Sequence, residues 1–236
     1  MITIAAVFAT LPASPSVALY AVGILVLLVV ATVAHVLFWT AKLRYDLPYA
    51  SQQRIATADG SAFDLRRVTV PPPGSTLPPI LMVHGLAANH RNIDLDEEAS
   101  LARHLANNGR DVWLITLRSG RSDRRFAEHK LATFSAMARY DVPGAIDAVL
   151  RATNSEKLDY VGFSMGGMLA LATIGTTVPT DRIRRLVIIG SPGRVAVPLP
   201  LLSRLRGVPS WIAPPSPFRW PARLVAFAVE WFTTPL

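Results

Sequence analysis

Cysteine is absent from this 236-residue chain. Its absence excludes a disulfide scaffold, a metal site with thiolate ligands and a cysteine nucleophile. Acidic residues are scarce, because 16 Asp and Glu stand against 24 Lys and Arg, which gives a formal net charge of +8. A basic balance of this kind suits an anionic membrane surface, a nucleic acid or an acidic partner.

Charged residues are also few, at 17% of the chain, whereas hydrophobic residues make up 51% and the mean hydropathy is +0.34. This composition excludes intrinsic disorder, which requires low hydrophobicity and high net charge. The apolar excess is concentrated in one run from Val17 to Trp39, where Thr32 and His35 are the clearly polar side chains. A helix of that length spans roughly 34 Å, which exceeds the thickness of about 30 Å of a bilayer's hydrocarbon core.

The residues that flank this run indicate a retained membrane helix rather than a cleaved signal peptide. A signal peptide has a basic start and an apolar core of about 7–15 residues, whereas no basic residue precedes Lys42 here. We therefore expect an N-terminal segment at 1–16, a single transmembrane helix at 17–40 and a juxtamembrane linker at 41–52. Because the positive charges follow the helix, the positive-inside rule predicts that the C-terminal bulk of this single-pass protein lies in the cytoplasm.

The rest of the chain alternates between patterns typical of strands and of helices. Strands are expected at 54–58, 62–70, 80–83, 112–117, 158–162 and 183–190, and helices at 94–107, 134–153 and 165–175. The first two strands, joined by Asp59-Gly60, have the pattern of a hairpin. The remaining alternation predicts an α/β fold with a mainly parallel sheet and flanking helices. The helix at 94–107 is expected to start with acidic residues that favour its positive N-terminus, namely Asp94, Asp96, Glu97 and Glu98.

One hexapeptide, Gly162-Phe163-Ser164-Met165-Gly166-Gly167, carries the clearest chemical signal. It follows an expected strand and precedes an expected helix, which is the context of a nucleophile elbow. A serine on such a tight turn needs small residues two positions before and after it, and Gly162 and Gly166 provide them. Gly167 allows the helix to approach the sheet closely. The pattern therefore predicts that Ser164 is a nucleophile presented beside a helix N-terminus.

A second pattern, His84-Gly85-Leu86, lies at the end of the expected strand at 80–83. Acyl transfer requires two N–H donors aimed at the developing oxyanion. One comes from the residue after the nucleophile, here Met165, and the other from the loop after an earlier strand, here Leu86. Both donors belong to the backbone, so apolar side chains are acceptable at these positions. His84 precedes the serine in the chain and is interpreted as a hydrogen-bonded structural histidine.

With these motifs the chain resembles the α/β-hydrolases, and within that fold the acid-lipase-like esterases. The matching stretches are Leu81-Met82-Val83-His84-Gly85-Leu86, Gly109-Arg110-Asp111-Val112-Trp113-Leu114, Tyr140-Asp141-Val142-Pro143-Gly144-Ala145-Ile146-Asp147 and Tyr160-Val161-Gly162-Phe163-Ser164-Met165-Gly166-Gly167. The resemblance covers residues 50–190 and implies hydrolysis of carboxylic esters of apolar acids through an acyl-serine intermediate. The chain departs from the family in two places. It has Thr116-Leu117-Arg118-Ser119-Gly120 where an Asn-x-Arg-Gly loop is usual, and Phe163 and Met165 where those lipases tend to place His and Gln.

No histidine follows Ser164, and only Asp181 and Glu230 are acidic after it. A serine nucleophile needs a histidine to take its proton and a carboxylate to orient that histidine, and in this fold both come later in the chain. Asp181 precedes an expected strand, which is the wrong end of the sheet. Six strands are expected where the full fold has eight. We therefore interpret residues 53–190 as an incomplete α/β-hydrolase core, truncated after about the sixth strand, and residues 191–236 as the start of a cap.

Four arginines lie close together after the expected strand at 112–117, namely Arg118, Arg121, Arg124 and Arg125. We interpret this cluster as part of a solvated loop. The alternative is contact with anionic substrates or with the head groups of acidic lipids, worth about 1 kcal/mol for each side chain near such a surface.

The sequence thus predicts a membrane-anchored serine hydrolase that acts on apolar esters or lipids near the bilayer, with no cofactor or metal ion implied. We expect little or no esterase activity from this chain alone. Two alternatives stay open: an acyltransferase of the same fold, and a non-catalytic membrane-bound remnant or lipid-binding module. Nucleic-acid binding is not expected, because the basic residues show no aromatic interleaving and no recognised reader motif.

Overall fold

The computed structural model describes residues 15–42, 46–72, 77–123 and 126–193. The chain divides into two compact units, of which one contains helix α2 (Pro15–Lys42) and the other begins at Asp46. The expected N-terminal segment at 1–16 and the expected cap at 191–236 lie outside the described residues, apart from residues 15–16 and 191–193.

Helix α2 covers the whole range in which a membrane helix is expected. Within its apolar portion, Ser16–Phe38, the most apolar window of 18 residues has a mean hydropathy of 2.8, and no residue of that window is buried. By length and composition this helix can cross a membrane, a test that a signal sequence near an N-terminus also passes.

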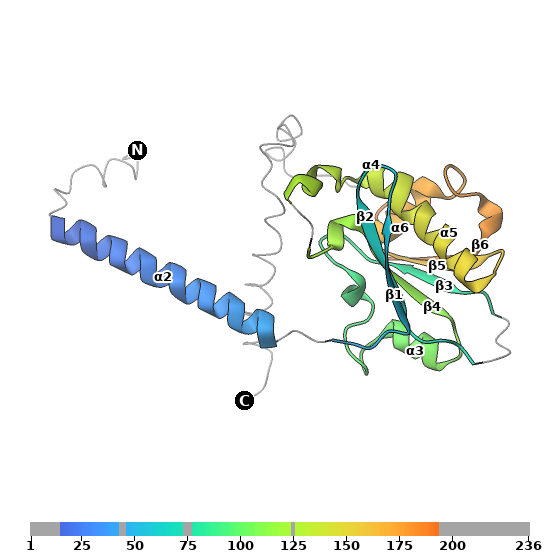
Figure 1. Ribbon diagram of the computed structural model, residues 1–236, viewed down its shortest axis with the longest axis horizontal. Coiled ribbons are helices and arrows are strands. Elements are labelled where there is room, and N and C mark those ends of the chain that lie inside the picture. Colours follow the sequence, from blue (N-terminus) through green and yellow to red (C-terminus); the bar gives the residue numbers. More distant parts are fainter. Residues whose placement is uncertain (1–14, 43–45, 73–76, 124–125, 194–236) are drawn as a thin grey trace. The chain divides into compact units, whose positions relative to one another are not determined.

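The second unit is built on a sheet of six strands among the described residues (Figure 1). The strands are β1 (Ser51–Ala56), β2 (Ala62–Arg67), β3 (Ile80–Val83), β4 (Val112–Thr116), β5 (Leu158–Phe163) and β6 (Ile183–Ile189). Their order across the sheet is β1-β2-β4-β3-β5-β6. The pairs β4–β3, β3–β5 and β5–β6 are parallel, whereas β1–β2 and β2–β4 are antiparallel. For the described residues, the expectation of a mainly parallel sheet that opens with a hairpin is confirmed.

The main helices follow the parallel strands. They are α3 (Leu101–Asn107), α4 (Phe134–Ala136), the π-helix η4 (Met137–Asp141), α5 (Val142–Thr153) and α6 (Met165–Thr173), and the 3₁₀ turns are η1 (His90–Asn92), η2 (Arg118–Gly120), η3 (Phe126–Leu131) and η5 (Thr180–Arg182). Segments α4, η4 and α5 run on without a break, which confirms the helix expected at 134–153. Pro143 lacks the N–H that would bond to the carbonyl of Arg139, and the wider π turn falls where that bond is missing.

Two apolar cores pack against opposite faces of the sheet. On one face, Phe63, Leu81 and Tyr160 pack with residues of α5 and α6. On the other face, Met82 and Leu114 pack against α3. In Figure 1, α5 and α3 accordingly lie on opposite sides of the strands. This three-layer arrangement is typical of parallel sheets, which need cover on both faces.

The helix expected at 94–107 is shorter than predicted, because α3 begins only at Leu101. The side chain of Asp96 accepts hydrogen bonds from the amides of Glu98 and Ala99, which holds this stretch in a turn instead of a helix. The buried carboxylate of Asp94 accepts from the hydroxyl of Ser100 at 2.6 Å, and Ser100 itself is the N-cap of α3. The acidic residues therefore precede the helix instead of forming its first turn.

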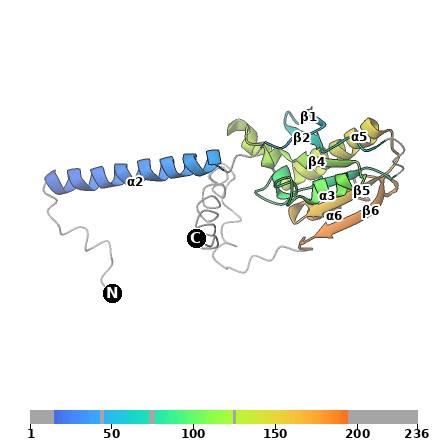
Figure 2. The same cartoon turned by 90° about the horizontal axis from the view of Figure 1, so that it is seen from below.

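Strand β6 lies at one margin of the sheet and pairs with β5 alone among the described strands (Figure 2). Its four consecutive apolar residues, Leu186–Ile189, are each between 37% and 45% exposed. Successive side chains on a strand point to opposite faces, so the apolar surface extends over both faces of β6. An exposed, apolar edge strand is a template for pairing with another chain.

The substitution Val187→Lys should therefore reduce self-association of the purified chain in detergent, as measured by light scattering after size-exclusion chromatography. A lysine on an edge strand opposes edge-to-edge pairing, and the 45% exposure of Val187 leaves room for its ammonium group in water. The free energy of unfolding should change by about 1 kcal/mol or less. As a control, Val70→Lys alters an apolar residue of 65% exposure outside the sheet. Equal association of V187K and the wild type would contradict the role of the edge.

Candidate functional site

The turn between β5 and α6 holds Ser164 in a strained conformation. Its backbone angles are φ 49° and ψ −113°, and only two other non-glycine residues with positive φ, Ala87 and Asn154, are found in the described part of the chain. Such conformations cost about 1–3 kcal/mol and persist where the surroundings enforce them. The amide of Ser164 donates to the carbonyl of Ile189 at 2.9 Å, and its own carbonyl accepts from Gly167 at 3.1 Å. The side chain of Ser164 is exposed.

Three glycines allow the chain to turn this tightly. A Cβ atom on Gly162 would lie 2.6 Å from the amide nitrogen of Gly167. A Cβ atom on Gly166 would collide with the carbonyl oxygen of Val83 on the neighbouring strand β3, and one on Gly167 would collide with the hydroxyl of Ser191. A side chain at any of these positions would therefore push α6 away from the sheet.

The loop after β3 brings a second backbone segment next to the serine. A Cβ atom on Gly85 would lie 3.2 Å from the Cβ of Ser164. Leu86, the next residue, is 69% exposed, whereas Met165 is buried at the first position of α6. Within the described residues, the amides of Leu86 and Met165 donate no hydrogen bond. Gly85, which immediately precedes Leu86, and Met165, the first residue of α6, thus lie next to Ser164.

His84 is fully buried, and both nitrogens of its ring are hydrogen-bonded. Nε2 accepts from the amide of Leu117 at 3.0 Å, so the ring proton must lie on Nδ1, which donates to the carbonyl of Gly85 at 2.8 Å. Burial lowers the pKa of His84 to about 4, against a weaker opposing effect of its bond to Gly85. His84 is therefore neutral at pH 7 and is held in one tautomer by its neighbours.

Of the other histidines of the second unit, His90 and His104 have described side chains, and neither contacts the serine turn. His90 is half-buried, and its Nδ1 is 2.9 Å from the hydroxyl of Thr116. Burial lowers the pKa of His90 to about 3, with additional effects of nearby arginines. His104 is exposed on α3, and the side chain of His129 lies outside the described residues. Within the described part of the chain, no side chain is hydrogen-bonded to the hydroxyl of Ser164.

Asp181 lies in η5, immediately before β6. Ser164 follows β5, and β5 and β6 are parallel, so the two residues lie beyond opposite ends of their strands. This geometry agrees with the expectation that Asp181 is at the wrong end of the sheet to orient a catalytic histidine. Glu230 lies outside the described residues.

The interpretation of Arg118 and Arg121 as residues of a solvated loop is wrong. Arg118 is fully buried, and its guanidinium donates to the buried carboxylate of Asp141 at 2.8 Å and to that of Asp59. Arg121 is also buried and pairs with Glu128 at 3.2 Å. A buried guanidinium needs carboxylate partners. Those of Arg118 come from the hairpin turn, which contains Asp59, and from helix η4, which contains Asp141. Arg124 and Arg125 lie outside the described residues.

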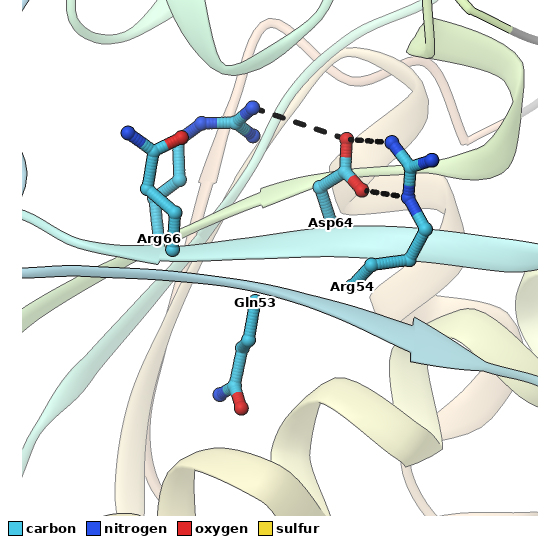
Figure 3. Close-up of a pocket in the computed structure, with 5 residues that line it drawn as sticks. Gln53, Arg54, Asp64 and Arg66 are labelled. Atoms are coloured by element: carbon cyan, nitrogen blue, oxygen red, sulfur yellow. Dashed lines mark hydrogen bonds and ion pairs between the residues drawn. The ribbon is translucent and has the colours of Figure 1, made fainter.

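A shallow cavity of about 290 Å³ opens on the hairpin β1–β2. Its lining residues are Gln52, Gln53, Arg54, Asp64 and Arg66. Figure 3 shows Arg54, Asp64 and Arg66 on one side of the hairpin, where Arg54 donates to Asp64 at 2.8 Å, while Gln53 points to the other side. None of these residues belongs to the loops that carry Ser164 and Leu86, so this cavity is separate from the serine turn. No group of three or more metal-ligating side chains occurs among the described residues.

The buried histidine makes a prediction about pH. The unfolded chain binds a proton at His84 more tightly than the folded chain does, because the pKa of His84 is depressed in the folded state. The stability that this group contributes is complete above about pH 6.5 and is lost as the pH falls toward 4. Between pH 8 and pH 5 the loss due to His84 should be about 2 kcal/mol in the free energy of unfolding.

This contribution is measured by urea unfolding at both pH values, followed by tryptophan fluorescence. The His84→Asn variant should show a pH dependence that is smaller by about the same 2 kcal/mol. His104→Asn substitutes an exposed histidine of α3 and is the matched control variant. An identical pH dependence in H84N and the wild type would contradict the depressed pKa.

Comparison with known proteins places the chain in a family. A family model of the alpha/beta hydrolase fold matches residues 78–227. Gastric triacylglycerol lipase of Homo sapiens is 29% identical over 171 residues, which are 67% of this chain and 43% of the lipase. Lipase member M of Homo sapiens is 30% identical over 138 residues, 52% of this chain and 33% of that protein. The chain thus spans less than half the length of these curated relatives.

Among solved structures, the thioesterase domain from the curacin biosynthetic pathway has a TM-score of 0.50 and 19% sequence identity, covering 70% of this chain and 54% of that domain. This likeness supports the fold alone. The family match, in contrast, extends over more than half of the chain and includes both the loop after β3 and the serine turn. The chain therefore belongs to the α/β hydrolase fold family.

Proposed function

We propose that this protein is a membrane-anchored serine hydrolase that acts on carboxylic esters of apolar acids. The observation that carries the proposal is the strained, exposed turn at Ser164, which lies beside Gly85 of the loop after β3. A backbone strain of this kind at an exposed serine is typical of a nucleophile elbow. The curated relatives support the substrate class, since one is named a triacylglycerol lipase.

In the proposed reaction the Oγ atom of Ser164 attacks the carbonyl carbon of the ester. The carbonyl π electrons move to oxygen, and the resulting oxyanion accepts hydrogen bonds from the amides of Leu86 and Met165. When the oxyanion collapses, the bond to the alcohol oxygen breaks, the alcohol leaves with a proton, and the acid remains bound to Ser164. Water then hydrolyses this acyl-serine, which releases the acid and restores the hydroxyl.

The hydroxyl proton of Ser164 needs an acceptor, which in this fold is usually a histidine that follows the serine in the chain. No histidine follows Ser164 in the sequence, and the described hydrogen bonds of His84 occupy both of its ring nitrogens. Loss of the general base costs about 10⁶ in kcat in a serine hydrolase. We therefore infer that the turn and the oxyanion donors are present but that this chain alone has little esterase activity.

An added base tests this inference, because imidazole in solution can take the proton that a catalytic histidine would take. A fluorophosphonate with an alkyl chain forms a bond from Ser164 Oγ to phosphorus, with loss of fluoride, and the product is located by mass spectrometry. Labelling at Ser164 should be slow in buffer and should accelerate by about 10-fold or more with imidazole.

Two variants make the result specific to the turn. Ser164→Ala should abolish the accelerated labelling, whereas Ser191→Ala, which removes the neighbouring hydroxyl beside Gly167, should leave it unchanged. Rapid labelling of the wild type without imidazole would contradict the missing base. No labelling at Ser164 even with imidazole would contradict a nucleophile and would favour the non-catalytic, lipid-binding alternative.

Membrane attachment is a separate part of the proposal and rests on α2. The helix has 28 residues, and its apolar stretch Ser16–Phe38 contains no Asp, Glu, Lys or Arg. It carries exposed large apolar side chains from Val17 to Val30. Leaving such a surface in water is unfavourable, by about 25 cal/mol for each Å² of apolar area. The positive charges that follow the helix favour the cytoplasmic side for the hydrolase unit.

Extraction of membranes with alkaline carbonate tests the anchor. The chain should stay in the pellet, and its mass should show that the α2 residues are retained. A protease added to inverted membrane vesicles should digest the hydrolase unit, as expected for a cytoplasmic location. Release of a chain shortened by cleavage within or just after α2 would contradict the anchor and would indicate a signal sequence.

A further inference from the structure

We propose that His84 is a positioning residue that orients the peptide between Gly85 and Leu86, so that the N–H of Leu86 points toward the oxyanion. This inference rests on the proposed function, because it concerns one of the two oxyanion donors. It assigns to His84 a role beyond that of a buried structural histidine. The assignment follows from the way its two ring nitrogens are used.

The two hydrogen bonds of His84 connect two different loops. Nε2 accepts from the amide of Leu117, at the end of β4, and Nδ1–H donates to the carbonyl of Gly85, in the loop after β3. Because a backbone N–H can only donate, the first bond fixes the proton on Nδ1 and makes the second bond a donation. The carbonyl of Gly85 is therefore held in place by a ring whose orientation is set by the adjacent strand.

The carbonyl of Gly85 and the N–H of Leu86 belong to one peptide unit. In a planar trans peptide these two groups point in opposite directions. When Nδ1 of His84 fixes the carbonyl toward the buried ring, the N–H must face away from the ring. Gly85 lies beside Ser164, since a Cβ atom on Gly85 would be 3.2 Å from that of Ser164 and 3.5 Å from the carbonyl of Phe163. The N–H of Leu86 therefore faces the side on which the serine hydroxyl is exposed.

Two more contacts hold this part of the loop. The amide of Gly85 donates to Oδ1 of Asn92 at 3.3 Å, which fixes the preceding peptide as well. Gly120, in the loop after β4, lies against the ring: a Cβ atom there would be 3.0 Å from Nε2 of His84 and 2.6 Å from the carbonyl of Ala88. The ring of His84 is thus enclosed between the two loops.

The sequence offers a direct spectroscopic test, because Gly85-Leu86 is the only Gly-Leu dipeptide in the chain. Labelling with ¹³C-carbonyl glycine and ¹⁵N-leucine gives a single peak in a carbonyl-to-amide NMR correlation of the full chain in detergent. That peak reports both the hydrogen bond to the Gly85 carbonyl and the environment of the Leu86 N–H. It does not depend on catalysis, so it can be observed whether or not the chain is active.

Two amide variants separate the two roles of the ring. The Nδ2 group of asparagine is the same number of bonds from the backbone as the Nδ1 atom of histidine. His84→Asn therefore keeps a donor for the carbonyl of Gly85 and loses the acceptor for the amide of Leu117. The Oε1 of a glutamine corresponds to Nε2, so His84→Gln keeps the acceptor for Leu117 and loses the donor. The Gly85-Leu86 peak should stay near its wild-type position in H84N and should shift in H84Q, with loss of the downfield carbonyl position that a hydrogen bond produces.

If His84 had a merely structural role, H84N and H84Q would shift the Gly85-Leu86 peak in the same way. The size of the shift would then follow each variant's loss of stability. His104→Asn, at an exposed position, is the control and should leave the peak in place. A wild-type peak position in folded H84Q would overturn the proposal. Should neither variant fold, the ring of the wild type is measured by long-range ¹H–¹⁵N correlation, and a proton found on Nε2 at neutral pH would also overturn it.

The link to the oxyanion is tested with an alkylboronic acid. Its trigonal boron accepts an electron pair from Ser164 Oγ, the hydroxyl proton passes to the buffer, and the tetrahedral adduct carries a negative charge beside the two amides. The Leu86 resonance should shift on addition to the wild type and not in Ser164→Ala. A different outcome is that the peak responds in H84N and H84Q as described above while the boronate causes no shift in the wild type. That result would contradict the oxyanion role of Leu86 but would still support the orientation of the Gly85-Leu86 peptide by His84.

Discussion

The serine turn depends on the absence of side chains at Gly162 and Gly166. Ser164 occupies a region of backbone angles that costs about 1–3 kcal/mol, and it can do so because strand β5, helix α6 and strand β3 approach one another at backbone contact distance. The carbonyl of Val83 leaves no space for a Cβ atom on Gly166. Close packing of β3, β5 and α6 therefore compensates for the strain. The turn that results leaves Ser164 exposed at the end of the sheet.

The order of the strands decides which loop meets the serine. Strands β3 and β5 are neighbours in parallel orientation, and Val83 is paired with Gly162. Their carboxyl ends consequently lie side by side, and the loops that leave them begin at adjacent points. This is why Gly85 and Leu86 lie beside Ser164, although almost eighty positions separate them in the sequence. Open α/β sheets bind ligands at this end of the strands for the same reason.

Buried polar groups fix the loops around the turn. His84 joins the loop after β3 to the end of β4, and Arg118, the next residue after Leu117, is held by the carboxylates of Asp141 and Asp59. A buried charge without partners is strongly destabilising, and these two carboxylates provide partners for the buried arginine. Its burial therefore ties the loop after β4 to helix η4 and to the hairpin turn. The position of the loops around Ser164 thus depends on buried side chains that lie outside the serine turn.

The sequence by itself determined the α/β architecture, all six described strands to within a few residues, the apolar helix α2 and the position of the serine turn. Each of these is encoded locally, in hydrophobic periodicity or in the spacing of glycines around one residue. The predicted start of helix α3 at residue 94 was wrong, because the side chain of Asp96 binds the amides of Glu98 and Ala99 and holds them in a turn. Only the tertiary structure decided that Arg118 is buried and that His84 links two loops. Asp59 and Asp141 lie 59 and 23 residues from Arg118, and Leu117 lies 33 residues from His84. No local pattern specifies contacts between segments that only the folded sheet brings together.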